Sequence, residues 1–224
     1  MAVLPADQST DDVAKPLRKD AERNRRRIMA AARELFAARG LTSLDEVAAH
    51  AGVGVGTVYR RFPSRDDLVD ALFDESVDQI IGHAEHAYAL AEREPFAALE
   101  HFLTRYLEMH AADRSLSQVL LTDLHGRHAL ELKKKPLKPH VFALVGRCKE
   151  AGAVRDDLDP TDVPMLLLML VSLMNASRDA APDLWRRHLR LALDGLRPGG
   201  HPLPTPAATP EQVPLVMRGA FGTR

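Results

Sequence analysis

The chain has 224 residues, of which 46% are hydrophobic and only 5% aromatic. This length fits one large domain or two small ones, with enough material for a hydrophobic core. Cys148 is the only cysteine, which excludes an internal disulfide, so we expect a reduced, cytoplasmic protein. The N-terminus has no basic segment followed by an apolar stretch, and the longest apolar run, residues 163–174, is too short to cross a bilayer. We therefore predict neither a signal peptide nor a membrane partner.

The formal net charge of −1 is the sum of two oppositely charged segments. Residues 15–65 contain twelve Lys and Arg against five Asp and Glu, whereas residues 66–112 contain two against eleven. A basic segment of this kind indicates a polyanionic partner, from which the acidic segment would stay away. A charged surface that only faces solvent is the alternative.

Apolar residues recur at three- and four-residue spacing from the N-terminus onward, which predicts helices. After a flexible arm over residues 1–20, a first helix should end at Gly40. A second helix should cover Leu44 to Ala51 and a third Val53 to Phe62. A break at Pro63 precedes a long fourth helix with acidic residues in its first turn.

The second half of the chain also has helical periodicity and no convincing strand. Further helices are predicted over Pro95 to Ala112, Leu116 to His125, Pro139 to Gly152, Thr161 to Ala180 and Asp183 to Leu196. The residues from 198 to 224 are rich in proline and glycine, which predicts a disordered tail. The expected fold is all-α, with about nine helices.

The segment SLDEVAAHAGVGVGTVYRRF meets the requirements of a helix-turn-helix. This motif needs a small residue where two short helices touch, a glycine in the turn, and apolar side chains that fill the angle. Ala48, Gly52 and Val58 meet these requirements at once. Gly56 lies inside the third helix, where it costs about 1 kcal/mol relative to alanine. A close approach of DNA or of the first helix would explain it.

Enzyme motifs are absent from the sequence. The glycines at 52, 54 and 56 do not follow the G-x-G-x-x-G spacing, because Thr57 stands where the last glycine belongs. No Glu-x-x-His pair, G-x-S-x-G elbow or phosphate-binding loop is present. A helical enzyme therefore stays only an alternative hypothesis.

Residues 25–73 resemble the DNA-binding domain of the TetR (tetracycline-repressor) family, through IMAAARELFAARG, VAAHAGVGVGTVYRRF and PSRDDLVDAL. The ending LALDGLRP is similar to the SbtR-like branch. The resemblance implies a helix-turn-helix domain over 21–65 and a helical effector-binding and dimerisation domain over 66–197. It also implies a set of DNA-contacting residues: Arg25, Arg26, Thr42, Ser43, Gly54, Val55, Thr57, Tyr59, Arg60 and Arg65. Gly54 departs from the serine more usual there, although glycine is a tolerable cap.

The same resemblance implies a small-molecule pocket and a homodimer interface in the second domain. The pocket candidates are Phe102, Tyr106, Met109, Leu120, Phe142, Met165, Met169 and Asn175. Methionines suit an adaptable apolar cavity, but each of these residues fits an ordinary core equally well. The candidates for the interface, on the last two long helices, are Leu166, Leu170, Trp185, Leu189 and Leu193.

We therefore predict a homodimeric repressor, without cofactor or catalytic residues, that a small-molecule effector releases from a palindromic DNA operator. A DNA-binding protein that senses no ligand is a further alternative. The histidine pairs His83/His86 and His125/His128 have a spacing compatible with a transition metal. Solvent-facing histidines explain them more simply, so we expect no metal site.

Overall fold

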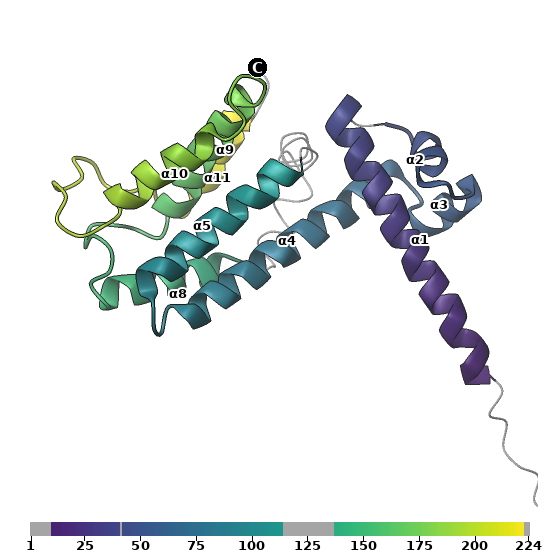
Figure 1. Cartoon of the computed structure of the whole chain (residues 1–224), viewed down its shortest axis with the longest axis horizontal. Coiled ribbons are helices and arrows are strands. Elements are labelled where there is room, and N and C mark those ends of the chain that lie inside the picture. Colours follow the sequence, from purple (N-terminus) through teal and green to yellow (C-terminus); the bar gives the residue numbers. More distant parts are fainter. Residues whose placement is uncertain (1–9, 41, 114–136, 222–224) are drawn as a thin grey trace, which may run out of the picture. The chain divides into compact units, whose positions relative to one another are not determined.

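The computed structural model describes residues 10–40, 42–113 and 137–221. Within these ranges the chain forms nine α-helices and no strand (Figure 1). The all-α prediction is confirmed. The chain divides into two compact units, Met1–Leu72 and Phe73–Arg224. The division lies inside a continuous helix, α4 (Arg65–Leu90), and not at its start as the sequence suggested.

The first unit contains α1 (Thr10–Arg39), α2 (Leu44–Ala51), α3 (Val55–Arg61) and the beginning of α4. Its core is formed by side chains that are almost fully buried: Ile28, Ala32, Phe36, Val47, Ala48, Val58, Phe62 and Leu68. These residues recur at three- or four-residue spacing, so each short helix turns one apolar face to the other two. The three helices are held together by this shared core, since helices as short as α2 and α3 are marginal by themselves.

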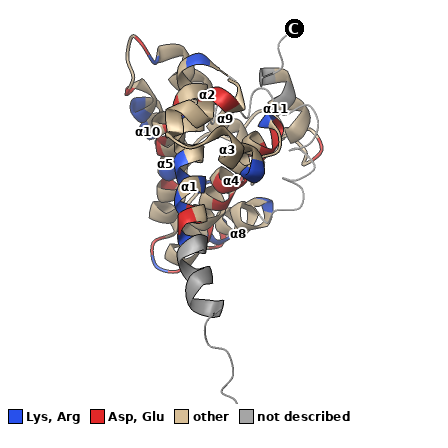
Figure 2. Ribbon diagram, turned by 90° about the vertical axis from the view of Figure 1, so that its right-hand side faces the viewer, with Lys and Arg blue, Asp and Glu red and all other residues tan. Residues whose placement is uncertain are grey.

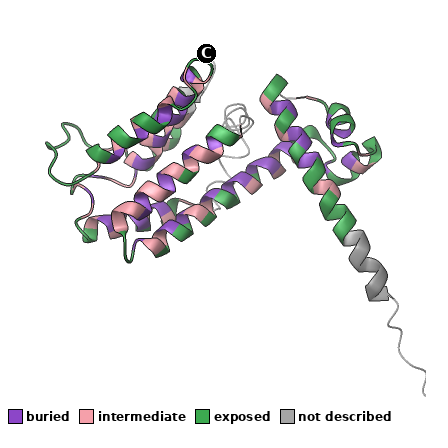
Figure 3. Ribbon diagram, in the orientation of Figure 1, coloured by how far each residue is buried: buried purple, intermediate pink, exposed green. Residues whose placement is uncertain are grey.

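Helix α1 begins eleven residues earlier than the sequence suggested. The expected flexible arm covered residues 1–20, but the structure has helix from Thr10. Once the packed part of α1 near Ile28 has formed, extending the helix toward the N-terminus adds backbone hydrogen bonds without a new nucleation cost. The charged residues before Ile28 can therefore continue the helix. The residues from 19 to 23 are exposed (Figure 3, green), so this part of α1 lies on the surface of its unit.

The second unit combines the rest of α4 with α5 (Pro95–Ala112), α8 (Leu137–Glu150), α9 (Asp162–Ser177), α10 (Leu184–Gly195) and α11 (Val213–Phe221). Helix α5 contacts α8 and α9, and α9 contacts α10 and α11. The core between them contains Phe102, Trp185 and a majority of leucine, valine and alanine side chains. None of the described helices is both long and apolar enough to cross a membrane.

Polar contacts fix neighbouring helices of this unit. The guanidinium of Arg190 on α10 donates to Glu100 of α5 at 2.8 Å, and both side chains remain partly in solvent. Arg147 of α8 stacks on the ring of Tyr88 with 3.8 Å to its centroid and donates to the Tyr88 carbonyl at 3.0 Å. Exposed ion pairs contribute little free energy, so the packing of the core dominates.

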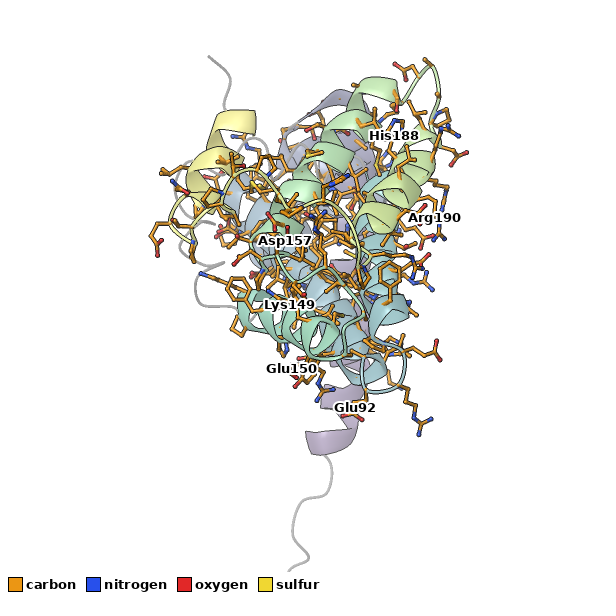
Figure 4. All side chains as sticks on the ribbon, turned by 90° about the vertical axis from the view of Figure 1, so that its left-hand side faces the viewer. Glu92, Lys149, Glu150, Asp157, His188 and Arg190 are labelled. Carbon is orange, nitrogen blue, oxygen red and sulfur yellow. The ribbon has the colours of Figure 1, made fainter. Side chains whose placement is uncertain are left out.

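The C-terminal tail is ordered against this unit over the described residues 198–221, which contradicts the expected disorder. Leu203 donates its backbone N–H to Asp157 at 2.8 Å, and Arg155 donates to the carbonyl of His201 (Asp157 is labelled in Figure 4). Arg155 and the Leu203 amide together lower the pKa of Asp157 to about 2. Composition predicted disorder because closely spaced prolines oppose a continuous helix. The extended part of the tail is held in place by these hydrogen bonds, and the tail then forms the short helix α11.

Candidate nucleic-acid interface

The corner between α2 and α3 has the geometry that a helix-turn-helix requires. Gly52 adopts the left-handed conformation, with φ +62° and ψ +40°. Its N–H donates to Ala49 at 3.3 Å, and the N–H of Val53 donates to Ala48 at 3.1 Å. This pair of bonds is the Schellman ending of a helix, which closes α2 in one residue and lets α3 begin at Val55. The predicted turn is confirmed.

A side chain from α1 holds this corner in place. The guanidinium Nη2 of Arg27 donates to the carbonyl oxygen of Gly52 at 3.1 Å. A second link joins α1 and α2 through Glu34 and His50, whose Oε2 and Nε2 atoms lie 2.6 Å apart. Sequence reasoning missed Arg27, because an arginine that reaches a backbone carbonyl 25 residues away leaves no local pattern.

Helices α2 and α4 carry matching N-terminal caps. Ser43 accepts a hydrogen bond from the N–H of Glu46, while Glu46 accepts one from the N–H of Ser43 at 2.9 Å. These bonds from Ser43 lower the pKa of Glu46. Ser64 and Asp67 repeat the arrangement at the start of α4, where the Ser64 N–H donates to Asp67 at 2.9 Å. Such reciprocal caps fix the direction in which each helix starts.

Helix α3 separates an inward and an outward face. Val58 and Phe62 are buried, at 0% and 4% exposure, and they fill the angle between the helices. On the opposite side Val55 is 45% and Tyr59 46% exposed. Large apolar and aromatic side chains presented to solvent on a short helix indicate a contact surface. We call Val55, Thr57, Tyr59 and Arg60 the recognition face.

Gly56 has no neighbour inside the protein that would require it. A Cβ atom built at this position meets nothing within 4 Å over the described residues. The close approach of the first helix, one of the two explanations offered by the sequence, is therefore wrong. The Gly56 carbonyl accepts a hydrogen bond from Nε of Arg60 at 3.1 Å, which lays the arginine side chain along the helix.

Most of the predicted DNA-contacting residues in and around α2 and α3 are accessible in the structure. Ser43, Gly54, Val55, Tyr59, Arg60 and Arg65 are exposed, whereas Thr42 and Thr57 are half-buried. The Ser43 hydroxyl is engaged in its own helix cap, so a phosphate would share it with Glu46. Arg25 is half-buried, and Arg26 forms an exposed 3.2 Å ion pair with Glu22. Figure 2 shows the Lys and Arg residues of this unit in blue.

The predicted pocket residues do not share one environment. Phe102 is a core side chain, and Tyr106 and Met109 pack against that core. Met169 is 66% exposed, so its assignment to an enclosed pocket is wrong. The remaining described candidates, Phe142, Met165 and Asn175, are half-buried. Leu120 lies outside the described residues.

The predicted interface residues pack against the core of their own protomer. Leu170, Trp185, Leu189 and Leu193 have between 1% and 5% of their surface exposed, and Leu166 packs against the same core. The structure contradicts their assignment to a dimer interface. Helical spacing correctly grouped these residues on one face, but it does not distinguish a face toward the protomer's own core from one toward a partner.

The first histidine pair is joined by a third histidine from another helix. His86 of α4 and His101 of α5 have ring centroids 5.1 Å apart. Desolvation lowers the pKa of His83 and of His101, and the neighbouring positive groups lower it further. Over the ranges that the structure describes, no three His, Cys, Asp or Glu residues are arranged to hold a metal ion. The second pair, His125 and His128, lies outside those ranges.

Sequence comparison divides the chain in the same way as the structure. Residues 28–72 match the family described as bacterial regulatory proteins, tetR family. Residues 94–198 match the family described as transcriptional regulator SbtR-like, C-terminal domain. An HTH-type transcriptional regulator of Staphylococcus aureus is 38% identical over 69 residues, which are 30% of this chain and only 37% of that protein.

Two solved structures are similar over almost their whole length. A TetR transcription regulatory protein from Mycobacterium vanbaalenii is 34% identical, with a TM-score of 0.58, over 81% of this chain and 99% of the other. A TetR transcriptional regulator from Streptomyces coelicolor is 30% identical, with a TM-score of 0.60, over 79% and 99%. The similarity therefore includes both units.

Proposed function

Because the chain belongs to the TetR family of transcriptional regulators, we propose that it is a cytoplasmic repressor that binds a palindromic DNA operator as a homodimer and leaves it when a small molecule binds. The observation that carries the proposal is the recognition face of α3, held outward by the corner at Gly52. Val55 and Tyr59 are exposed together on one face of a short helix, which is typical of a surface that contacts a partner.

The chemistry of the recognition face matches the edges of base pairs. Arg60 has the planar donor group that pairs with guanine, and the methyl groups of Val55 and Thr57 suit the methyl group of thymine. The hydroxyl of Tyr59 can donate to a phosphate, which positions the protein without reading sequence. The absent side chain of Gly56 leaves room for close approach of the DNA.

A dimer explains the exposed apolar side chains of α9 and α10. Met169 and Leu191 are 66% and 57% exposed in the protomer. These two residues, and not the buried leucines predicted from the sequence, support a two-fold interface made of α9 and α10. A homodimer places two recognition helices on successive major grooves, about 34 Å apart or a multiple of that distance. The operator would then be palindromic.

Effector control requires that ligand binding change how the two recognition helices are held. Helix α4 belongs to both units, because it is continuous across their division at Leu72 and Phe73. A ligand in the second unit that favours one orientation of α4 would change the separation of the recognition helices. It can shift DNA binding only by the difference between its affinities for the two orientations.

Selection of DNA from a random double-stranded pool tests the proposal without knowledge of the operator. Purified full-length protein should enrich a dyad-symmetric sequence and bind it with two protomers per site. The affinity should fall steeply with salt, since phosphate contacts release counterions. Enrichment of no sequence, or equal affinity for the selected and a shuffled duplex, would contradict the proposal.

A further inference from the structure

The buried faces of α5 and α9 each end on one polar side chain. On α5 this is His110, which follows Leu103 and Leu107 on the buried face. On α9 it is Ser177, which follows Leu170 and Met174. Both polar residues are in the last turn of their helix.

Neither of these two side chains has a hydrogen-bond partner in the described part of the protein. Both ring nitrogens of His110 are buried and unpaired, and so is the hydroxyl oxygen of Ser177. His110 is only 2% exposed. An unpaired buried polar group costs about 1–3 kcal/mol, so two of them together indicate a site that something else completes.

These groups lie at the same end of the second unit. The Tyr106 ring is 4.7 Å from the His110 ring, measured between centroids. Arg178, which directly follows Ser177, is close enough to His110 to influence its protonation. Helices α5 and α9 are in contact, and Figure 1 shows their C-terminal ends on the same side.

The electrostatics of this end favour an uncharged partner. Burial lowers the pKa of His110 to about 4 and raises the pKa of Tyr106 to about 12, so both are neutral near pH 7. Arg178 donates to Asn175 at 3.0 Å, and both Arg178 and Asp113 have further interactions. A charged group brought here would lose its hydration without a free counter-charge.

We propose that Tyr106, His110 and Ser177 form the polar end of the effector site, and that the effector is an uncharged, largely apolar molecule whose carbonyl or hydroxyl group hydrogen-bonds His110 and Ser177. The inference rests on the effector control proposed above and adds the chemical class of the ligand. Neutral imidazole has one donor and one acceptor nitrogen, and a serine hydroxyl has both functions. A carbonyl oxygen can accept a hydrogen bond from the donor nitrogen of His110 or from the Ser177 hydroxyl, and a ligand hydroxyl group can also donate to the acceptor atom of either side chain.

Four probes with the same eight-carbon chain test the ligand class: octan-2-one, octan-1-ol, octanoate and octylammonium. Binding is followed by calorimetry and by the fluorescence of Trp185, the only tryptophan, which is buried in the core of this unit. The two neutral probes should bind at least about tenfold more tightly than the two charged ones. In protein labelled with ¹⁵N-histidine, the His110 ring nitrogens should shift with the neutral probes only.

Substitutions test whether the neutral probes contact His110 and Ser177. His110→Phe should weaken octan-2-one binding at least about tenfold, which corresponds to about 1.4 kcal/mol. Ser177→Ala, a smaller change that leaves the fold intact, should weaken it about threefold or more. His101→Phe, on the same helix but half-buried elsewhere, is the matched control and should leave binding unchanged.

Binding of none of the probes, equal binding of charged and neutral probes, or undiminished binding to His110→Phe would overturn the inference. Release of the selected operator is measured by fluorescence anisotropy in the same samples. Neutral probes that bind through His110 but release no DNA would support the site and contradict effector control. Release of DNA by a probe whose binding does not depend on His110 would contradict the proposed site but would still support effector control.

Discussion

The Arg27 guanidinium on α1 and the carbonyl of Gly52 in the turn are joined by a 3.1 Å hydrogen bond. The bond connects the helix that packs behind the motif to the single residue where the motif changes direction. A Cβ atom at Gly52 would lie 2.9 Å from Nη2 of Arg27. The turn depends on glycine because of its left-handed backbone, and a side chain at this position would in addition displace the flexible end of Arg27 from its hydrogen bond.

Replacement of Gly52 should destabilise the first unit. We expect Gly52→Ala to lower the free energy of unfolding by about 1–2 kcal/mol, because an L-residue resists the left-handed conformation. Gly52→Val should cost more, because a branched Cβ crowds the same backbone. Urea denaturation followed by circular dichroism measures the change. Unaltered stability in both variants would show that the turn assignment is wrong.

Replacement of Gly56, four residues later, should have the opposite effect on stability. Gly56→Ala should raise the free energy of unfolding by about 0.5–1 kcal/mol, since alanine is the better helix former and the space is open. The same variant should bind the selected operator more weakly, because its methyl group enters the recognition face. If the Gly56→Ala protein binds DNA as well as the wild type, no close approach occurs at this residue.

The recognition face should contribute to DNA affinity without contributing to folding. Tyr59→Ala and Arg60→Ala should each weaken operator binding by about 1–3 kcal/mol, with an unchanged melting temperature. Arg93→Ala, an exposed arginine in the turn between α4 and α5, is the control and should bind like the wild type. Gel-shift titrations at fixed salt provide the comparison. Wild-type affinity in both α3 variants would place the DNA-binding surface elsewhere.

The exposed apolar side chains of α9 and α10 should determine the oligomeric state. The double variant Met169→Glu, Leu191→Glu should be a folded monomer, because buried negative charges oppose association while both side chains are exposed in the protomer. Analytical ultracentrifugation distinguishes monomer from dimer. The variant should also lose preference for two half-sites over one. A dimer that persists unchanged would require a different interface.

The buried His110 should make the stability of the second unit depend on pH. Burial lowers its pKa from 6.5 to about 4, with a smaller opposing effect of Asp113 and a further lowering by Arg178. Between these values the unfolded chain binds a proton that the folded protein does not, so stability present above pH 6.5 is lost as the pH falls toward 4. The loss amounts to about 3 kcal/mol at pH 4.

His110→Phe provides the control for this dependence. The variant should lack the part of the pH-dependent loss that belongs to His110, and its melting temperature at pH 7 should not fall, since two unpaired nitrogens are removed. Thermal unfolding of both proteins between pH 7 and pH 4 makes the comparison. Parallel curves for the two proteins would mean that His110 is accessible to protons in the folded state.

The elements that depend on local spacing were predictable from the sequence. Ala48, Gly52 and Val58 located the corner, because its requirements fall on neighbouring residues and follow from backbone geometry. The prediction of the dimer interface was wrong for a physical reason. Trp185, Leu189 and Leu193 have the same helical spacing whether they pack against the protomer's own core or against a second protomer. The hydrogen bond from Arg27 has no sequence signal, and neither do the partners that hold the proline-rich tail.

The contact between α11 and α9 has a practical consequence for work with shortened forms of the protein. A chain that stops after Arg197 would lose the ordered tail and uncover the part of α9 that α11 covers. Such a truncated protein would expose additional apolar surface on α9 and would tend to aggregate during purification. Samples for biophysical work should therefore retain the final 27 residues of the 224-residue chain.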